Sequence, residues 1–216
     1  KKNTGSGSGS RGGDVAAALP LIPNQPPEEK PGAFTDVDEG HWAREDIDYL
    51  RGLGMVSGVT ESAFEPERAV TRAEFVKMLT DMLGLAPAKY AGAFSDVDAA
   101  DWFAGAVQTA LENGLAAGSD GQFLPDKTIS REEMAKMLVS AYELRFGNIA
   151  AERSGYTDRD NFSEWAAAYI DKAAAAGLMN GTENGGFSAK EQATRAQAAT
   201  VIARFHKNMA KGGVSK

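Results

Sequence analysis

The pattern of apolar and polar residues predicts six amphipathic helices, arranged as three pairs between residues 32 and 206. In the second helix of each pair, apolar residues stand three, six, seven and ten positions after an arginine, which places them on one helix face. In the first pair these residues are Phe75, Met78, Leu79 and Met82. A glycine twelve positions after a tryptophan is placed to end each first helix in the left-handed conformation. These glycines are Gly54, Gly114 and Gly177.

The six predicted helices belong to three copies of one unit about 60 residues long. Each copy opens on an aromatic residue and an Asp-x-Asp stretch, followed by a tryptophan, two glycines four positions apart, a phenylalanine and a Thr/Ser-Arg pair. The arginines stand 30, 29 and 30 positions after their tryptophans. Units this small bury their apolar faces better together than alone. We therefore expect one all-α body of three helix-loop-helix repeats with pseudo-threefold symmetry.

The repeats and their flanks divide the chain into five segments. The first is rich in Gly and Ser and then in Pro, as in a linker that is flexible at first and stiffer later. The last is a short basic tail. The predicted segments are a linker at 1–31, repeats at 32–91, 92–153 and 154–206, and a tail at 207–216.

Composition excludes several classes of function. The net charge of −7 argues against a general nucleic-acid binder. The chain has no cysteine, so it has no disulfide or thiolate site, and its two histidines are His41 and His206. No apolar run approaches the roughly 20 residues that span a bilayer. We find no phosphate-binding loop and no nucleophile motif. We expect no metal site, no cofactor, no catalytic residues and no membrane insertion.

The arginine of each Thr/Ser-Arg pair is a candidate binding residue. The segments that begin at Thr71, Ser130 and Thr194 match a helix capping box, which accounts for the hydroxyl and for the Glu or Gln three positions later. It does not account for a cation at the first helical position, which opposes the helix dipole. An arginine beside exposed helix N–H groups could bind a carboxylate or phosphate. The alternative is a structural ion pair with a neighbouring Asp. The arginines are Arg72, Arg131 and Arg195.

One aspartate per copy precedes the first helix. Capping that helix or pairing with an arginine is the simpler role, and a hydrogen bond to a sugar hydroxyl is the more specific one. A calcium loop of the EF-hand type would need further acidic ligands that the copies lack. The aspartates are Asp36, Asp96 and Asp158.

Two roles are open for the tryptophan of each copy and for the second of its two glycines. Packing in the core is the default for an aromatic residue on a helix, and stacking on a sugar is the alternative. Each second glycine serves either a turn with positive φ or the close approach of a ligand. We expect Phe64, Phe123 and Phe187 to anchor the loops. The candidates are Trp42, Trp102, Trp165, Gly58, Gly118 and Gly181.

This ordered set of motifs resembles three S-layer homology repeats in tandem, over about residues 32–206. The resemblance implies a trimer-like spindle with a central helical bundle and grooves between neighbouring repeats. It implies non-covalent anchoring on a secondary cell wall polymer that carries pyruvate-ketal N-acetylmannosamine. The arginine would receive the ketal carboxylate, and the aspartate, tryptophan and glycines would line the same groove. It also implies an extracellular location, at the cell wall of a Gram-positive bacterium, and attachment to a larger surface protein.

The third copy departs most from the family pattern. Tyr156 replaces Phe, Gln197 replaces Glu, and Ala189 stands where the other copies have proline. A groove built mainly from this copy is therefore the least supported. Two other functions stay open: a protein–protein assembly module of a surface layer, and an enzyme on wall glycans. Threefold repetition argues against the enzyme, because it multiplies binding sites rather than building one asymmetric catalytic centre.

Charge bears on how such a polymer is bound. Residues 32–206 contain 16 Lys and Arg against 27 Asp and Glu. An acidic body repels a polyanion overall, so binding requires a few local cationic pockets with directed hydrogen bonds.

Overall fold

The computed structural model describes residues 32–210, and the predicted linker at 1–31 and the end of the tail lie outside them. Within this range the protein is all-α, with no strand, which confirms the expected fold class. Among residues 32–210 the regular structure consists of six α-helices and a single 3₁₀ turn, η2 (Arg159–Asn161). The helices are α1 (Arg44–Gly52), α2 (Arg72–Met82), α3 (Ala104–Glu112), α4 (Arg131–Phe146), α5 (Ala167–Ala175) and α6 (Arg195–Ala210).

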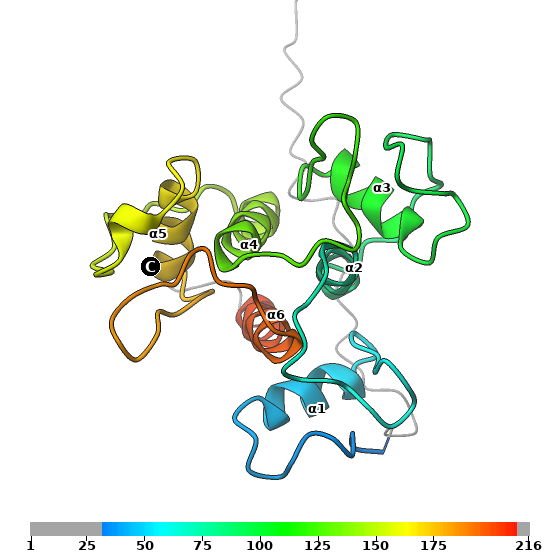
Figure 1. Ribbon diagram of the computed structural model, residues 1–216, viewed down its shortest axis with the longest axis horizontal. Helices are drawn as coiled ribbons and strands as arrows, with labels where there is room; N and C mark the ends of the chain where they lie inside the picture. The colour runs from blue at the N-terminus through cyan, green and yellow to red at the C-terminus, as the bar shows by residue number, and fades with distance from the viewer. Residues whose placement is uncertain (1–31, 211–216) are drawn as a thin grey trace, which may run out of the picture.

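The three second helices form a central bundle, and the three first helices lie around it as separate lobes (Figure 1). Each outer helix packs on the central helix of a different repeat: α3 on α2, α5 on α4, and α1 on α6. The last pair joins the first repeat to the third, so the arrangement is a closed cycle. These outer helices do not pack chiefly on the central helices of their own repeats, and a single core runs through all three repeats.

A ring of three backbone hydrogen bonds closes the bundle around its axis. The N–H of Val70 donates to the carbonyl of Ala193 at 2.9 Å, Ala193 donates to Ile129 at 2.9 Å, and Ile129 donates to Val70 at 3.1 Å. All three side chains are fully buried. Since each residue directly precedes the N-cap of a central helix, the ring sets the three helix N-termini side by side.

The first helices end as the glycine pattern predicts. Gly54, Gly114 and Gly177 have φ of 69°, 67° and 62°, in the left-handed region that favours glycine. These helices begin later than predicted, however, two residues after each tryptophan. The tryptophans therefore lie in the turns that precede these helices. The prediction that they pack in the core is wrong, because Trp42 is 61% exposed, Trp102 64% and Trp165 46%.

The second glycines do not serve a positive-φ turn, because Gly58, Gly118 and Gly181 are not among the glycines with positive φ. Close packing requires them instead. A Cβ on Gly118 would lie 2.3 Å from Cε1 of Phe94 and 2.4 Å from the carbonyl oxygen of Gln122. Gly58 and Gly181 meet the first aromatic ring of their own repeats in the same way.

The loop phenylalanines are anchors, as expected. Phe64, Phe123 and Phe187 are at most 1% exposed, and each packs against the aromatic residue that opens its repeat, with ring centroids 5.3–5.5 Å apart. At the other end of the chain one predicted boundary is wrong. Helix α6 continues to Ala210, so residues 207–210 belong to the helix and not to a tail. None of the helices described is both long and apolar enough to cross a bilayer.

Candidate functional site: grooves between the repeats

The N-termini of the central helices are capped by neighbouring chain. Thr71 and Ser130 form the complete capping boxes that their sequences predict. The N–H of Arg72 donates to the carbonyl of Lys127 at 2.9 Å, and the next N–H, of Ala73, donates to Pro125 at 3.0 Å. Both carbonyls belong to the loop of the second repeat. Since α4 and α6 repeat this arrangement, the expectation of exposed helix N–H groups that bind an anion is wrong.

The arginine side chains cross to the neighbouring repeat in the same direction. Nε of Arg72 donates to the carbonyl of Phe123 at 2.9 Å, and Nη2 donates to that of Ala117 at 2.9 Å. The guanidinium also lies over the Phe123 ring, 4.9 Å from its centroid. Burial lowers the pKa of Arg72, while the charges of Glu133 and Asp96 raise it in part, and the group stays protonated at physiological pH.

The other two arginines make equivalent contacts. Nε of Arg131 donates to Phe187 at 2.8 Å, and Nε of Arg195 donates to Phe64 at 2.8 Å. Three arginines thus link the first repeat to the second, the second to the third and the third to the first. The alternative, an ion pair between each arginine and a repeated aspartate, is also wrong within residues 32–210. Arg195 forms an ion pair with Glu74, and neither Arg72 nor Arg131 forms an ion pair with any carboxylate there.

The repeated aspartates fix the loop to which the arginines bind. Asp36 accepts hydrogen bonds from the N–H groups of Phe64, at 2.8 Å, and Glu65, at 2.7 Å. Asp96 and Asp158 accept equivalent bonds from their own loops. Desolvation raises the pKa of Asp36, but these bonds and the charge of Arg195 outweigh it, so the pKa lies below its usual value. The aspartates cap the loops rather than the first helices.

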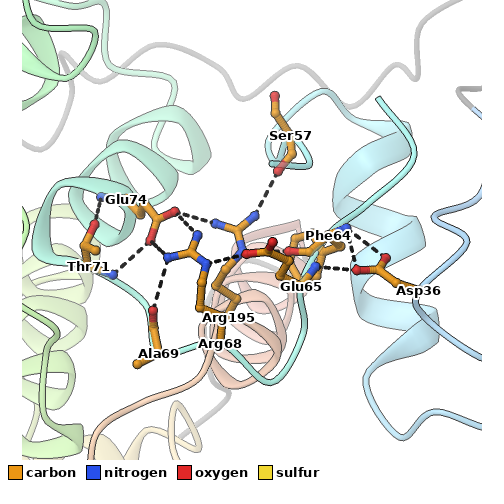
Figure 2. A network of polar contacts seen from close by, with 9 residues as sticks. All are labelled: Asp36, Ser57, Phe64, Glu65, Arg68, Ala69, Thr71, Glu74 and Arg195. Carbon is orange, nitrogen blue, oxygen red and sulfur yellow. Dashed lines mark hydrogen bonds and ion pairs between the residues drawn. The ribbon is translucent and has the colours of Figure 1, made fainter. Parts of the chain in front are cut away.

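Figure 2 shows this polar network between the third and first repeats. The Asp36 carboxylate accepts a hydrogen bond from the N–H of Phe64, and the carbonyl of Phe64 accepts one from Nε of Arg195. Arg195 pairs with Glu74 at 2.9 Å, and Glu74 also accepts the N–H of Thr71 in the capping box. Backbone and side chains therefore fix the guanidinium in one orientation.

Two hollows lie beside these arginines, and each contains residues from all three repeats. The Arg72 groove combines Arg72, the loop of the second repeat, Glu133 and Lys136 of α4, and Trp165 of the third repeat, around a volume of about 280 Å³. The Arg195 groove combines Arg195, the loop of the first repeat with Gly58, Glu74 and Lys77 of α2, and Trp102 of the second repeat, around about 360 Å³.

The structure therefore regroups the residues that the sequence assigned copy by copy. A groove takes its arginine from one repeat, its loop from the next and its tryptophan from the one after that. The repeat register assigns Arg131, the loop with Gly181, and Trp42 to the third such position. The aspartates lie behind the loops, with their oxygens occupied by backbone N–H groups.

Lys77 and Lys136 are groove residues that our sequence interpretation missed. Each stands five positions after its arginine, and this shared register was the available signal. The third copy breaks the pattern, since Thr200 occupies the equivalent position.

The two grooves differ in charge balance. In the Arg195 groove, Glu74 pairs with Arg195 and Arg68, and Asp81 pairs with Lys77. In the Arg72 groove, Glu133 pairs with Lys127 from outside the groove at 2.8 Å. Within residues 32–210, neither Arg72 nor Lys136 has an acidic partner, and the Nζ of Lys136 lies 5.5 Å from the Trp165 ring centroid. The Arg72 groove thus contains two cations that form no ion pair with a groove carboxylate, although the charge of Glu133 acts on Arg72 at longer range.

These residues suit binding rather than metal chemistry. No cluster of three or more His, Asp or Glu side chains in the described chain is arranged to hold a metal ion. What each groove offers is a fixed guanidinium, an amine and an exposed indole ring.

Comparison with known proteins identifies the repeats. The family described as S-layer homology domain matches residues 33–76, 93–135 and 155–199. Among similar proteins are an amylopullulanase of Thermoanaerobacterium thermosulfurigenes, 36% identical over 78% of this chain and 9% of its own length, and the exoglucanase XynX of Acetivibrio thermocellus, 35% identical over 81% and 16%. The S-layer protein sap of Bacillus anthracis is 30% identical over 81% of this chain and 21% of its own.

The chain spans less than a quarter of the length of each of these relatives. The matched family and the S-layer relatives support a role in anchoring at the bacterial cell surface. The chain belongs to the S-layer homology domain family and carries three of these domains in tandem.

Proposed function

We propose that this module anchors a larger surface protein by binding an anionic secondary cell wall polymer in its inter-repeat grooves, and that the Arg72 groove is the main site. The ligand unit is a terminal sugar with a carboxylate, of the pyruvate-ketal N-acetylmannosamine type. The observation that carries the proposal is that Arg72 and Lys136, which form no ion pair within residues 32–210, lie beside the exposed ring of Trp165.

The hydrogen bonds of Arg72 to protein carbonyls use Nε and Nη2. This leaves Nη1 to donate to a ligand carboxylate, with Lys136 supplying a second charge-assisted bond. The half-exposed indole of Trp165 offers an apolar face for the sugar ring. The body around this groove is acidic, so an anion gains its attraction at these side chains and not from the overall field.

The volume of the groove agrees with a small ligand. Sites for small molecules usually enclose about 300–1,000 Å³, and the Arg72 groove lies near the lower limit at about 280 Å³. This supports recognition of one terminal unit. The carboxylate should therefore determine affinity more than glycan length does.

The relatives support a wall location for the larger protein. Two are named as enzymes and one as an S-layer protein, and each is several times longer than the region it shares with this chain. We propose that this chain likewise serves as a non-catalytic anchor at the wall of a Gram-positive bacterium.

Calorimetry with a methyl glycoside of the pyruvylated sugar tests the site. Lys136→Ala removes an exposed amine that forms no ion pair within residues 32–210, so the fold should be unaffected. We expect affinity to fall about 5- to 10-fold, the effect of losing one charge-assisted contact. Lys77→Ala is the matched control in the other groove and should change affinity less than twofold. Equal losses in both variants would overturn the assignment to the Arg72 groove.

A second experiment separates anchoring from protein assembly. Purified wall polymer stripped of protein should retain the chain on a column, and retention should fall when the ketal carboxylates are removed by mild acid. A chain that passes through such a column would instead favour the assembly module.

A further inference from the structure

Glu132 is a buried carboxylate that the repeat pattern does not explain. It occupies the second position of α4, where the other two copies have Ala73 and Ala196. Only 4% of the residue is exposed. Burying a charge is costly unless hydrogen bonds and an opposite charge satisfy it. The contacts of Glu132 therefore indicate what the residue stabilises.

Glu132 bonds to the third repeat, immediately ahead of Trp165. Its carboxylate accepts the N–H of Ser163 at 3.1 Å, the hydroxyl of Ser163 at 2.8 Å and the amine of Lys190 at 2.9 Å. The carbonyl of Ser163 in turn accepts the N–H of Ala166 at 2.9 Å. Trp165 thus lies in a turn whose first residue is held by the neighbouring repeat.

Lys136 lies one helical turn after Glu132, on the same face of α4. It contacts the other part of this segment, with its Nζ 5.5 Å from the ring centroid of Trp165 and 5.9 Å from that of Tyr169. Trp165 is also less exposed than the other tryptophans, at 46% against 61% for Trp42 and 64% for Trp102. One face of α4 therefore contacts the Trp165 turn at two points.

The equivalent turns in the first two repeats are held by residues of their own repeat. Before α1, Nδ1 of His41 accepts the N–H of Ala43, and Nε2 of His41 contacts Glu67. Before α3, Asp101 accepts the N–H of Asp98. Of the three turns that contain a tryptophan, the Trp165 turn is the one that bonds to a buried carboxylate of another repeat, Glu132.

We propose that Glu132 is a positioning residue for ligand binding: its bonds to Ser163 hold Trp165 against the Arg72 groove, so that this groove is formed before the ligand arrives. This inference rests on the proposed function, since it concerns the same site. Preorganisation raises affinity because the protein loses less conformational freedom on binding. This preorganisation would raise the affinity of the Arg72 groove beyond what the charges of Arg72 and Lys136 supply.

The test uses Trp165 as the only tryptophan. Trp42→Phe and Trp102→Phe remove the two other tryptophans, both of which are exposed. In this background Glu132→Ala, Glu132→Gln, Ser163→Ala and Lys190→Ala are compared by acrylamide quenching, fluorescence anisotropy and titration with the methyl glycoside of the pyruvylated sugar.

Glu132→Ala should raise quenching of Trp165, lower its anisotropy and weaken binding about 5- to 10-fold. Glu132→Gln keeps an acceptor for Ser163 and should recover most of the affinity. Lys190→Ala leaves both bonds between Glu132 and Ser163 in place but removes the amine that contacts Glu132 and Ser163, so its loss of affinity should be smaller than that of Glu132→Ala. Ser163→Ala removes one of these two bonds, so it should be intermediate, and it keeps the proposal testable if Glu132→Ala does not fold.

A folded Glu132→Ala variant with unchanged quenching and unchanged affinity would overturn the positioning role. Loss of thermal stability with unchanged affinity would overturn it too, because it would show a purely structural residue. If the parent itself does not bind the glycoside, the proposed function fails instead. The quenching comparison would still report whether Glu132 holds Trp165.

Discussion

Arg195, in the last helix, donates from Nε to the carbonyl oxygen of Phe64 in the first repeat at 2.8 Å, across 131 positions of sequence. The guanidinium also donates to the carbonyl of Ser57 and to the carboxylate of Glu74, and it lies 4.6 Å from the centroid of the Phe64 ring. The bond closes the cycle of three repeats, so the arginine that the family pattern suggests for ligand binding is also a structural link.

Arg195→Ala should therefore destabilise the whole bundle. It leaves the buried carbonyl of Phe64 without its donor and removes one of the two arginines paired with Glu74, which should cost about 2–4 kcal/mol. Urea denaturation followed by circular dichroism measures the change. A loss below about 0.5 kcal/mol, the usual effect of a neutral surface substitution, would contradict the structural role. Because an arginine variant changes stability as well as ligand binding, it cannot test binding alone. Lys136→Ala is therefore the better variant for testing ligand binding.

Gly118→Ala should destabilise the second repeat. The added Cβ would lie 2.3 Å from Cε1 of Phe94, so the ring or the loop must move, at a cost of about 1–3 kcal/mol. Gly40→Ala is a matched control, since a Cβ there meets nothing within 4 Å. Thermal unfolding should separate the two variants. Equal melting temperatures would show that the glycine is not required by packing.

Acid should weaken the third repeat through Asp171. Desolvation raises the pKa of this carboxyl, but bonds from Arg159, at 2.6 and 2.7 Å, and from Ser154 outweigh it and lower the pKa to about 2. A lowered folded-state pKa stabilises the protein above the ordinary value of 3.8 and loses this effect as the pH falls towards 2. Stability should therefore drop between about pH 4 and pH 2.

Asp171→Asn should lower stability at pH 7 by about 1.5–3 kcal/mol, the range for hydrogen bonds to charged groups. It should also flatten the dependence on pH below 4. Urea midpoints at pH 7, 4 and 3 provide the comparison. A variant with the same acid slope as its parent would assign that slope to other carboxyls.

A single repeat should not fold alone. Helix α3 packs on α2 and α5 packs on α4, so a peptide of residues 92–153 lacks the partners of both its helices. Its circular dichroism should show little helix and no cooperative melting. A cooperative transition in this peptide would contradict the shared core.

The sequence was sufficient for the helices, their glycine ends and the threefold repetition, because these depend on local periodicity and on register. It could not decide whether the tryptophans are buried or exposed. The amphipathic pattern that includes Trp102 is the same whether the helix begins before or after this residue. The sequence also could not pair repeats. Arg72, Lys136 and Trp165 meet only because each outer helix packs on the central helix of another repeat, a long-range relationship without a local signal.

The most direct test of the proposed binding site is a crystal structure of the protein soaked with a single terminal pyruvylated N-acetylmannosamine. We predict that the sugar occupies the Arg72 groove, with its carboxylate within hydrogen-bond distance of Arg72 and Lys136 and its ring against Trp165. A ligand bound outside the grooves, or with its carboxylate directed away from both cations, would contradict the proposed binding site.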